Sequence, residues 1–217
     1  MTQPRSANHR LPAHDRRRQL LEAALEVFSR KGFEGSTTKE IAAAAGVTEA
    51  MVFRHFPSKQ ALYAAVLEYE SEFCGSEVWM QQIREEMERN DDAGLLRTLA
   101  SVVMAGYRKD VRFERLMLFA ALEGHEQGLA HHRQFSLPVF DLLHDYFARR
   151  KQEGALREVN VGSVILAITG MSQFYAMLTQ MFGYSAKLRD DEVVEAFTGI
   201  VLNGIRPSSV PPEKGIS

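Results

Sequence analysis

Two short helices joined by a tight turn, between residues 32 and 62, are the feature that most constrains this chain. The sequence TTKE at residues 37–40 has the form of a capping box, which predicts a helix that begins at its first threonine. Gly46 ends this helix where a left-handed residue is needed, and Thr48 can cap the next helix. Pro57 ends the second helix, and Ser58 can cap a third helix that begins at Lys59. A helix, a turn that contains glycine and a second helix form the helix-turn-helix arrangement.

The second of these helices is predicted to face the major groove of DNA. Residues four apart share one side of a helix, so Val52 and Phe56 are expected to face inward. Ala50, Met51 and Arg54 then lie on the opposite side. Alanine and methionine can contact a thymine methyl group, and arginine can bond to guanine or to a phosphate. The outward face therefore suits base recognition.

The N-termini of these helices form the second part of the predicted DNA surface. Backbone N–H groups and the helix dipole favour a phosphate at such positions. A helical hairpin with no nucleic-acid role is the alternative that periodicity alone leaves open. The predicted DNA-contacting residues are Thr37, Thr38, Lys39, Thr48, Glu49, Ala50, Met51, Phe53, Arg54, His55 and Lys59.

The segment TTKEIAAAAGVTEAMVFRHFPSKQALYAAVL, preceded by a helix that ends FSRKGFEGS, is similar to a known family. Over about residues 16–67 it resembles the N-terminal domain of TetR-type bacterial transcriptional regulators. In that family, residues at the positions of Thr38, His55 and Lys59 usually contact phosphates, and those at positions 48–54 face bases or backbone. The resemblance implies a homodimer with a DNA-binding domain and a second, ligand-binding domain.

Three departures from the family pattern affect what can be transferred. Phe53 stands where a phosphate-bonding tyrosine is common, so that hydroxyl contact is missing. Glu49 stands where lysine is frequent, and its carboxylate repels phosphate unless it accepts a hydrogen bond from a cytosine amine. Ala50 and Met51 replace a common Gly-Thr pair. The operator sequence therefore cannot be borrowed from relatives.

The charge of the chain is divided unevenly. Residues 1–59 hold ten Lys and Arg against six Asp and Glu, whereas the remaining residues hold sixteen against twenty-two. A basic N-terminal part followed by an acidic remainder is typical of a specific DNA-binding protein, and this division argues against a general nucleic-acid coating protein. We expect a disordered basic arm at 1–14, a helix-turn-helix domain at 15–62, a helical regulatory and dimerisation domain at 63–206 and a disordered tail at 207–217.

The N-terminal arm and the single cysteine carry weaker signals. Arg5 and Arg10 could contact a minor groove or flanking phosphates, and a merely solubilising arm is equally compatible with them. No apolar run follows the basic residues, so we expect no signal peptide. Cys74 is the only cysteine, so the chain cannot form an intrachain disulfide, and no cationic residue adjoins it in sequence to lower the pKa of its thiol. We interpret it as a passive thiol in a reducing bacterial cytoplasm.

Residues 159–186 contain no charged side chain. The length suits a membrane span, but Asn160, Ser163, Gln173 and other polar residues interrupt it, so a helix buried at a subunit interface is the better interpretation. An apolar stripe on the last helix can complete a four-helix bundle between two subunits, as the resemblance also implies. The predicted dimer interface is Ser163, Ala167, Gly170, Val193, Phe197, Ile200, Val201 and Gly204.

Soft and aromatic side chains are frequent in the predicted body. Methionine adapts to irregular apolar shapes, and a helical bundle can hold a cavity between its helices. The resemblance implies that such a cavity binds an inducer, for which an apolar or aromatic small molecule is favoured; no cofactor is expected. The residues predicted to line it are Trp79, Met104, Tyr107, Phe113, Met117, Met171, Phe174 and Tyr175.

Residues 123–132, EGHEQGLAHH, come nearest to a metal or catalytic cluster. Helical spacing separates His132 from His125, and the adjacent His131 and His132 cannot face one point, so we expect a solvated loop without a metal. No phosphate-binding loop, CxxC pair or HExxH motif is present, which argues against an enzyme. Two alternatives to a ligand-responsive repressor stay open: a DNA-binding protein without an inducer, controlled by a protein partner or architectural, and an enzyme built on the helical body.

Overall fold

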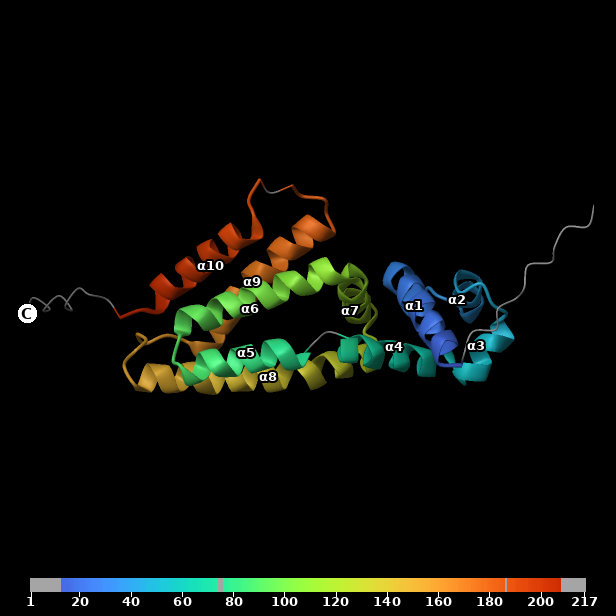
Figure 1. Cartoon of the computed structure of the whole chain (residues 1–217), viewed down its shortest axis with the longest axis horizontal. Helices are drawn as coiled ribbons and strands as arrows, with labels where there is room; N and C mark the ends of the chain where they lie inside the picture. Colours follow the sequence, from blue (N-terminus) through green and yellow to red (C-terminus); the bar gives the residue numbers. More distant parts are fainter. Residues whose placement is uncertain (1–12, 74–75, 186, 208–217) are drawn as a thin grey trace, which may run out of the picture. The chain divides into compact units, whose positions relative to one another are not determined.

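The computed structural model describes residues 13–73, 76–185 and 187–207, and within these ranges the regular secondary structure is entirely helical (Figure 1). The predicted all-α fold is therefore confirmed. The predictions for Arg5, Arg10, Cys74 and most of the tail lie outside the described residues. The helices are α1 (Ala13–Lys31), α2 (Thr38–Ala44), α3 (Glu49–His55), α4 (Lys59–Phe73), α5 (Ser76–Glu88), α6 (Asp92–Lys109), α7 (Val111–Glu123), α8 (Glu126–Gln152), α9 (Val161–Gln180) and α10 (Asp190–Ile205).

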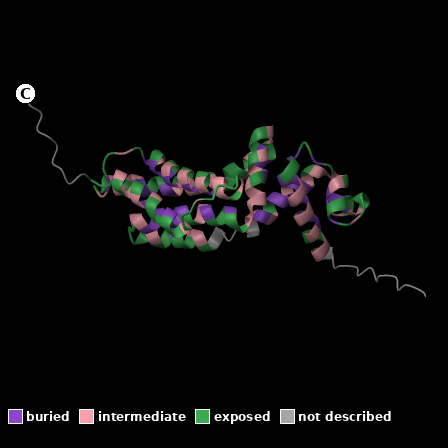
Figure 2. Cartoon of the chain, turned by 90° about the horizontal axis from the view of Figure 1, so that it is seen from above, coloured by how far each residue is buried: buried purple, intermediate pink, exposed green. Residues whose placement is uncertain are grey.

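The chain forms two compact units that are not continuous in sequence. The first combines the described part of Met1–Glu72 with Arg112–Ala130, and the second combines the described parts of Phe73–Val111 and His131–Ser217. The segment 112–130 belongs to the expected regulatory domain in sequence order, but in the structure it is part of the first unit. In each unit the buried residues gather on the inner sides of the helices (Figure 2).

The core of the first unit is built from α1, α2, α3, α4 and α7. Phe28 and Tyr63 are fully buried, and their rings meet edge to face with centroids 5.1 Å apart. Ile41, Val52 and Phe56 join them, as their spacing predicts. Burial of a large apolar side chain stabilises a fold by about 1.5–3 kcal/mol. This small core therefore holds the helix-turn-helix segment against α1.

Helix α7 contacts α1 and the turn that follows α1 within the first unit. Near its N-terminus, Arg112 Nη2 lies 3.0 Å from Glu22 Oε2 and Nη1 lies 3.7 Å from Glu26 Oε2. Leu116, one turn further, is fully buried in the same core as α1. Near its C-terminus, Glu123 accepts a hydrogen bond from the backbone N–H of Phe33 at 2.9 Å. Ion pairs, apolar burial and a side-chain-to-backbone bond thus join α7 to α1 and to the turn that follows α1.

The second unit is a bundle in which α6 packs against α5, α9 and α10. Leu95, Leu96 and Ala100 of α6 are fully buried in its core, and Ile168 of α9 and Phe147 of α8 are fully buried with them. Burial of several large apolar side chains from different helices gives this unit a core of its own. It can therefore be stable without drawing on the core of the first unit.

The histidine-rich segment differs from its prediction. Helix α8 begins at Glu126, so His131 and His132 are helical rather than part of a solvated loop. Gly124 has φ +63 and separates α7 from this helix, which leaves His125 in the short connection. Pro138 lies inside α8. The loop prediction was wrong because the segment carries no breaker after Gly124 other than a glycine, which a long helix tolerates.

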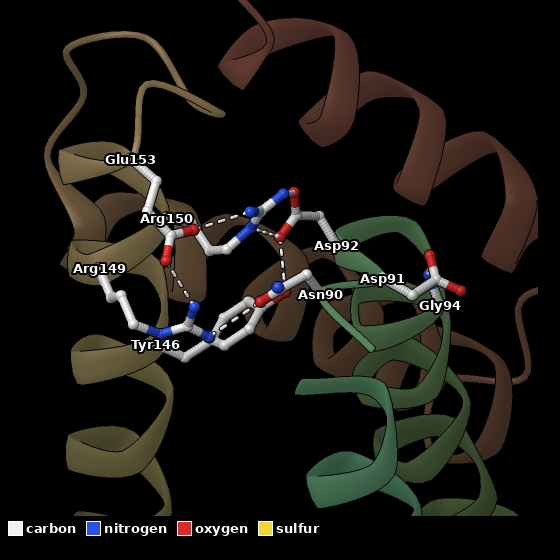
Figure 3. Close-up of polar contacts among 8 residues, drawn as sticks. All are labelled: Asn90, Asp91, Asp92, Gly94, Tyr146, Arg149, Arg150 and Glu153. Carbon is white, nitrogen blue, oxygen red and sulfur yellow. Dashed lines mark hydrogen bonds and ion pairs between the residues drawn. The ribbon is translucent and has the colours of Figure 1, made fainter. Parts of the chain in front are cut away.

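A polar network joins the C-terminal part of α8 to the N-terminus of α6 (Figure 3). Arg150 Nε and Nη2 donate to the two carboxylate oxygens of Asp92 at 3.0 and 2.9 Å, and the Tyr146 hydroxyl donates to Asp92 Oδ1 at 2.6 Å. The side chains of Arg150 and Asp92 are only 16% and 13% exposed. Burial, followed by the bond to Asp92, raises the pKa of Tyr146 well above its usual value. The network is satisfied internally, so we assign it a structural role.

Loss of the charge at the centre of this network is expected to destabilise the second unit. Asp92→Asn removes the charge that binds Arg150 Nε and Nη2 and leaves Arg150 only its ion pair with Glu153 at 2.9 Å, which should lower the free energy of unfolding by about 1.5–3 kcal/mol. Urea unfolding at a fixed protein concentration measures the change. Glu195→Gln is the matched control, because it breaks the exposed pair with Arg97 at 2.7 Å and should cost about 0–1 kcal/mol. Equal losses in the two variants would contradict the structural role.

Candidate nucleic-acid interface

The N-terminus of α2 is fixed by the predicted capping box. Thr37 Oγ1 accepts a hydrogen bond from the Glu40 backbone N–H at 3.2 Å, and Glu40 Oε2 accepts one from the Thr37 N–H at 3.0 Å. Lys31 Nζ donates to the other carboxylate oxygen of Glu40 at 2.6 Å. The hydrogen bond from Lys31, followed by those from Thr37, lowers the pKa of Glu40. These bonds connect the end of α1 directly to the start of α2.

The turn between α2 and α3 also follows its prediction. Gly46 has φ +65, and the space around a Cβ there is open, so the backbone conformation alone favours glycine. The Val47 N–H donates to the Ala42 carbonyl at 2.9 Å and closes the turn. Gln19 Nε2 of α1 donates to the Ala45 carbonyl at 2.8 Å. This last contact fixes the end of α2 to α1, and nothing in the local sequence pattern indicates it.

Helix α3 has one buried and one exposed side. Val52 and Phe56 are 1% and 2% exposed, which confirms the predicted inward face. Ala50 and Arg54 are exposed and Met51 is half-buried on the other side. Because the buried pair sets the rotation of the helix about its axis, it also determines which side chains can reach a groove. The outward face is therefore small, apolar and basic, as base recognition requires.

Residues around this face complete the predicted surface. Thr48 occupies the N-cap position of α3, but its side chain makes no capping hydrogen bond. Phe53 is 47% exposed, which is unusual for a phenylalanine and leaves its ring accessible at the side of α3. His55 is half-buried, and Lys39 is exposed on the first turn of α2. The predicted residues of α2 and α3 thus lie in one helix-turn-helix segment.

Thr38 and Glu49 contact each other in the structure. The Thr38 hydroxyl donates a hydrogen bond to Glu49 Oε1, which links the first turn of α2 to the first turn of α3. A hydroxyl has a single hydrogen, so this bond occupies the donor that the resemblance implies for a phosphate. It also fixes the position of the Glu49 carboxylate at the start of α3. Phosphate contact by Thr38 therefore requires its hydroxyl to leave Glu49.

Lys59 likewise has partners within the chain. Its Nζ donates to the backbone carbonyls of Phe33 at 2.6 Å and Ser36 at 2.8 Å, and it lies 4.2 Å from the centroid of the Phe33 ring. An ammonium group has three donors, so one remains for a phosphate. Ser58, the preceding residue, caps α4 as predicted, because its Oγ accepts from the Ala61 N–H at 3.0 Å. Lys59 thus stabilises the turn between α1 and α2.

The residues predicted to line a ligand cavity are divided between the two units. Phe113 and Met117 of α7 pack against the core of the first unit. Met104 and Tyr107 are buried in the core of the second unit, and Trp79, Met171 and Tyr175 are partly buried side chains that pack against this core. Phe174 is 58% exposed on α9. The structure therefore brings together five of the eight predicted residues in one core, namely Trp79, Met104, Tyr107, Met171 and Tyr175.

Five of the eight residues predicted for the dimer interface line one groove on α9 and α10. An open, mainly apolar groove of about 360 Å³ lies between these helices and is lined by Ser163, Ala167, Ile200, Val201 and Gly204. Ile200 is 62% exposed, although it is a large apolar residue. This face supplies the apolar surface that a second subunit could cover.

The remaining predicted interface residues have different positions. Gly170 is exposed on α9, and Phe197 is half-buried with its ring against Tyr175, at a centroid distance of 6.2 Å. Val193 is only 2% exposed and lies in the chain's own core, so its side chain has almost no surface left for a partner. Leu166 is 64% exposed on the same helix as Gly170, and the sequence prediction omitted it.

Two other predictions concern a membrane span and a metal site. Helix α9 is long and apolar enough to cross a membrane by length and composition alone, a test that core helices of soluble proteins also pass. Its exposed side carries Ser163, Gln173 and Gln180, which a lipid-facing surface disfavours. Among the described residues, no group of three or more His, Cys, Asp or Glu side chains is arranged to hold a metal ion.

Known proteins are similar to residues 20–66 in sequence and to most of the chain in fold. Residues 20–66 match the family described as "Bacterial regulatory proteins, tetR family". The HTH-type transcriptional activator FasR of Mycolicibacterium smegmatis is 48% identical over 60 residues, and this match spans 28% of this chain and only 27% of FasR. The HTH-type transcriptional regulator RutR of Escherichia coli is 26% identical over 198 residues, which are 88% of this chain and 91% of RutR.

A solved structure shows the same architecture. The crystal structure of AibR in complex with isovaleryl coenzyme A and operator DNA aligns with a TM-score of 0.57 and 21% identity, over 85% of this chain and 97% of the AibR chain. The relatives are named as transcriptional regulators rather than enzymes. Together with the capped helix-turn-helix segment, the match over residues 20–66 shows that the first unit carries the DNA-binding domain of the TetR family of bacterial regulatory proteins.

Proposed function

We propose that this protein is a ligand-responsive repressor that binds a roughly palindromic operator as a homodimer in the bacterial cytoplasm. The observation that carries the proposal is the division of α3 into a buried side, Val52 and Phe56, and an outward side, Ala50, Met51 and Arg54. A helix held in this way presents a constant set of groups to base edges. Arg54 is the one side chain of this outward set that can bond two acceptors of a guanine.

The apolar face of α9 and α10 supports the homodimer. Leu166 and Ile200 are both more than 60% exposed, and the groove between the two helices is mostly apolar. A two-fold axis through such a face makes each subunit cover the same patch of the other. The two α3 helices would then contact half-sites about one DNA turn, roughly 34 Å, apart.

The proposed effector is an apolar or aromatic small molecule that binds in the second unit. AibR, which has the same fold, was crystallised in complex with both isovaleryl coenzyme A and operator DNA. In this chain, Trp79, Met104, Tyr107 and Tyr175 lie in one core of methionine and aromatic side chains, which can adapt to a ligand. A ligand that prefers one conformation of the second unit shifts the equilibrium away from the conformation that binds the operator. The size of this shift cannot exceed the difference between the ligand's affinities for the two conformations.

A DNA-binding protein without an inducer is the second candidate. It is favoured by the location of Phe113 and Met117 in the first unit and of Phe174 on the surface, because these residues are not part of the core that holds the other five. Such a protein would be controlled by a protein partner or would act architecturally. The two candidates differ in whether a small molecule releases the operator.

The base-recognition role of Arg54 predicts a sequence-dependent loss. Arg54→Ala should weaken binding to a duplex selected from a random library by about 5- to 100-fold, because one bidentate contact contributes about 1–3 kcal/mol. The preference for a base at one position in each half-site should be lost at the same time. Fluorescence anisotropy with the selected duplex and with single-base variants measures both effects.

Lys39→Ala is the matched control for this prediction. Lys39 is exposed on α2 and is expected to contact a phosphate, so its removal should weaken all duplexes similarly and reduce the slope of log affinity against log salt by about one. If Arg54→Ala also weakened every duplex equally, Arg54 would be only a phosphate contact and its proposed base-recognition role would be wrong.

The interface proposal predicts that one charge on the α9–α10 face dissociates the dimer. Ile200→Glu places a carboxylate on the apolar face, and sedimentation velocity should then show monomers at concentrations where the wild type is dimeric. Leu122→Glu is the control, because Leu122 is 84% exposed on α7, outside this face. A dimer that survives Ile200→Glu, or one that only Leu122→Glu dissociates, would place the interface elsewhere.

The effector proposal predicts release of the selected duplex by a small molecule. A panel of apolar and aromatic acids, esters and acyl-coenzyme A thioesters is tested for loss of anisotropy and for a rise in melting temperature of the DNA-free protein. An active compound should lose its effect in Met104→Trp, which fills the core beside Tyr107, while duplex binding is retained. A panel in which nothing both binds and releases DNA would favour the second candidate.

A further inference from the structure

The turn between α1 and α2, residues 32–36, determines how the helix-turn-helix segment continues from α1. Gly32 begins it with φ +72, and Phe33 and Ser36 are both buried. Thr37, the N-cap of α2, follows immediately. A change in this turn would therefore alter the direction in which α2 leaves α1, and α3 would move with it.

The carboxylate of Glu123 binds the backbone of this turn. Oε2 accepts from the Phe33 N–H at 2.9 Å, and Oε1 accepts from the Glu34 N–H at 3.3 Å. A Cβ atom at Gly32 would lie 1.9 Å from Glu123 Oε1, so any other residue there would displace the carboxylate. Glycine is thus needed for the close approach as well as for its φ angle. Hydrogen bonds to a carboxylate are about twice as strong as neutral ones.

Lys59 binds the other polar groups of the same turn. Its ammonium group donates to the carbonyls of Phe33 and Ser36. The anionic Glu123 therefore binds N–H groups of this turn, and the cationic Lys59 binds its carbonyls. The Phe33 ring is enclosed by Tyr63 and His125, with centroids at 5.3 and 4.3 Å. Two elements distant in sequence, the end of α7 and the start of α4, therefore fix this turn.

We propose that Glu123 is a positioning residue for operator recognition: it holds the turn between α1 and α2 in the conformation from which α3 meets the operator correctly. The inference rests on the proposed DNA-binding function and adds to it a residue that lies outside the helix-turn-helix segment. Glu123 acts by preorganisation, since a turn already held in place loses less conformational freedom when DNA binds.

Electrostatics and positioning predict opposite results when Glu123 is changed. Removal of a negative charge from a DNA-binding unit should, by Coulomb attraction alone, strengthen binding to every duplex. Loss of positioning should weaken binding to the selected operator and leave unrelated duplexes unaffected or bound slightly more tightly. A residue that serves stability alone should lower the melting temperature without changing the operator affinity of the folded protein. The three roles can thus be separated.

The test uses the full-length variants Glu123→Gln and Glu123→Ala, with Glu34→Gln as the charge control. Glu34 is exposed in the same turn, so its change removes the same charge without removing the carboxylate that binds the backbone. Glu123→Ala should lower affinity for the selected operator about tenfold, Glu123→Gln should lower it less because one oxygen acceptor remains, and Glu34→Gln should not lower it. Hydrogen exchange at the Phe33 amide should be faster in Glu123→Gln than in the wild type, and fastest in Glu123→Ala.

Several results would overturn the proposal. Operator affinity that is unchanged or raised in both Glu123 variants would do so, as would an equal loss on operator and unrelated duplexes. If Glu123→Ala fails to fold, Glu123→Gln decides alone, because it must show both weaker operator binding and faster exchange at Phe33. A wild-type protein without any preferred sequence would instead contradict the proposed function, before any variant is compared.

Discussion

The burial of Val52 and Phe56 beneath α3 is the constraint on which the DNA-binding surface depends. Helix α3 has seven residues, and an isolated helix of that length is not stable in water. Its existence and its rotation are therefore set by burial of its inward side chains in the core of the first unit and by the turns at its two ends. Once these two side chains face inward, Ala50, Met51 and Arg54 must face outward. The chemistry of recognition follows from the packing of a small apolar core.

Each unit has its own core and presents its own surface. The first unit presents the outward side of α3, and the second presents the apolar face of α9 and α10 around Ile200. Segment 112–130 is the exception to a simple division, since it interrupts the second unit in sequence and packs with the first. Arg112 and Glu123 bind the first unit at the two ends of α7. The structure thus places a helix from the middle of the chain where it can support the DNA-binding segment.

Local signals predicted much of the fold, whereas distant contacts could not be predicted. The capping box at Thr37, the glycine turn at Gly46 and the cap at Ser58 each depend on residues close together in sequence, and all are confirmed. Glu123 contacts a turn 90 residues away, so no spacing rule indicates it. The sequence prediction treated that glutamate as part of a solvated loop. Ligand and interface residues were chosen by type, which cannot show that Val193 lies in the chain's own core or that Phe113 packs with the first unit.

Selection of bound duplexes from a random library by the wild-type protein tests the central claim most directly. The account predicts a palindromic consensus whose half-sites lie about one helical turn apart, with a guanine in each half-site that is lost when Arg54 is replaced. That result would support both the outward face of α3 and the two-fold dimer. Strong binding to the library without any consensus, or a consensus with a single half-site, would contradict the account.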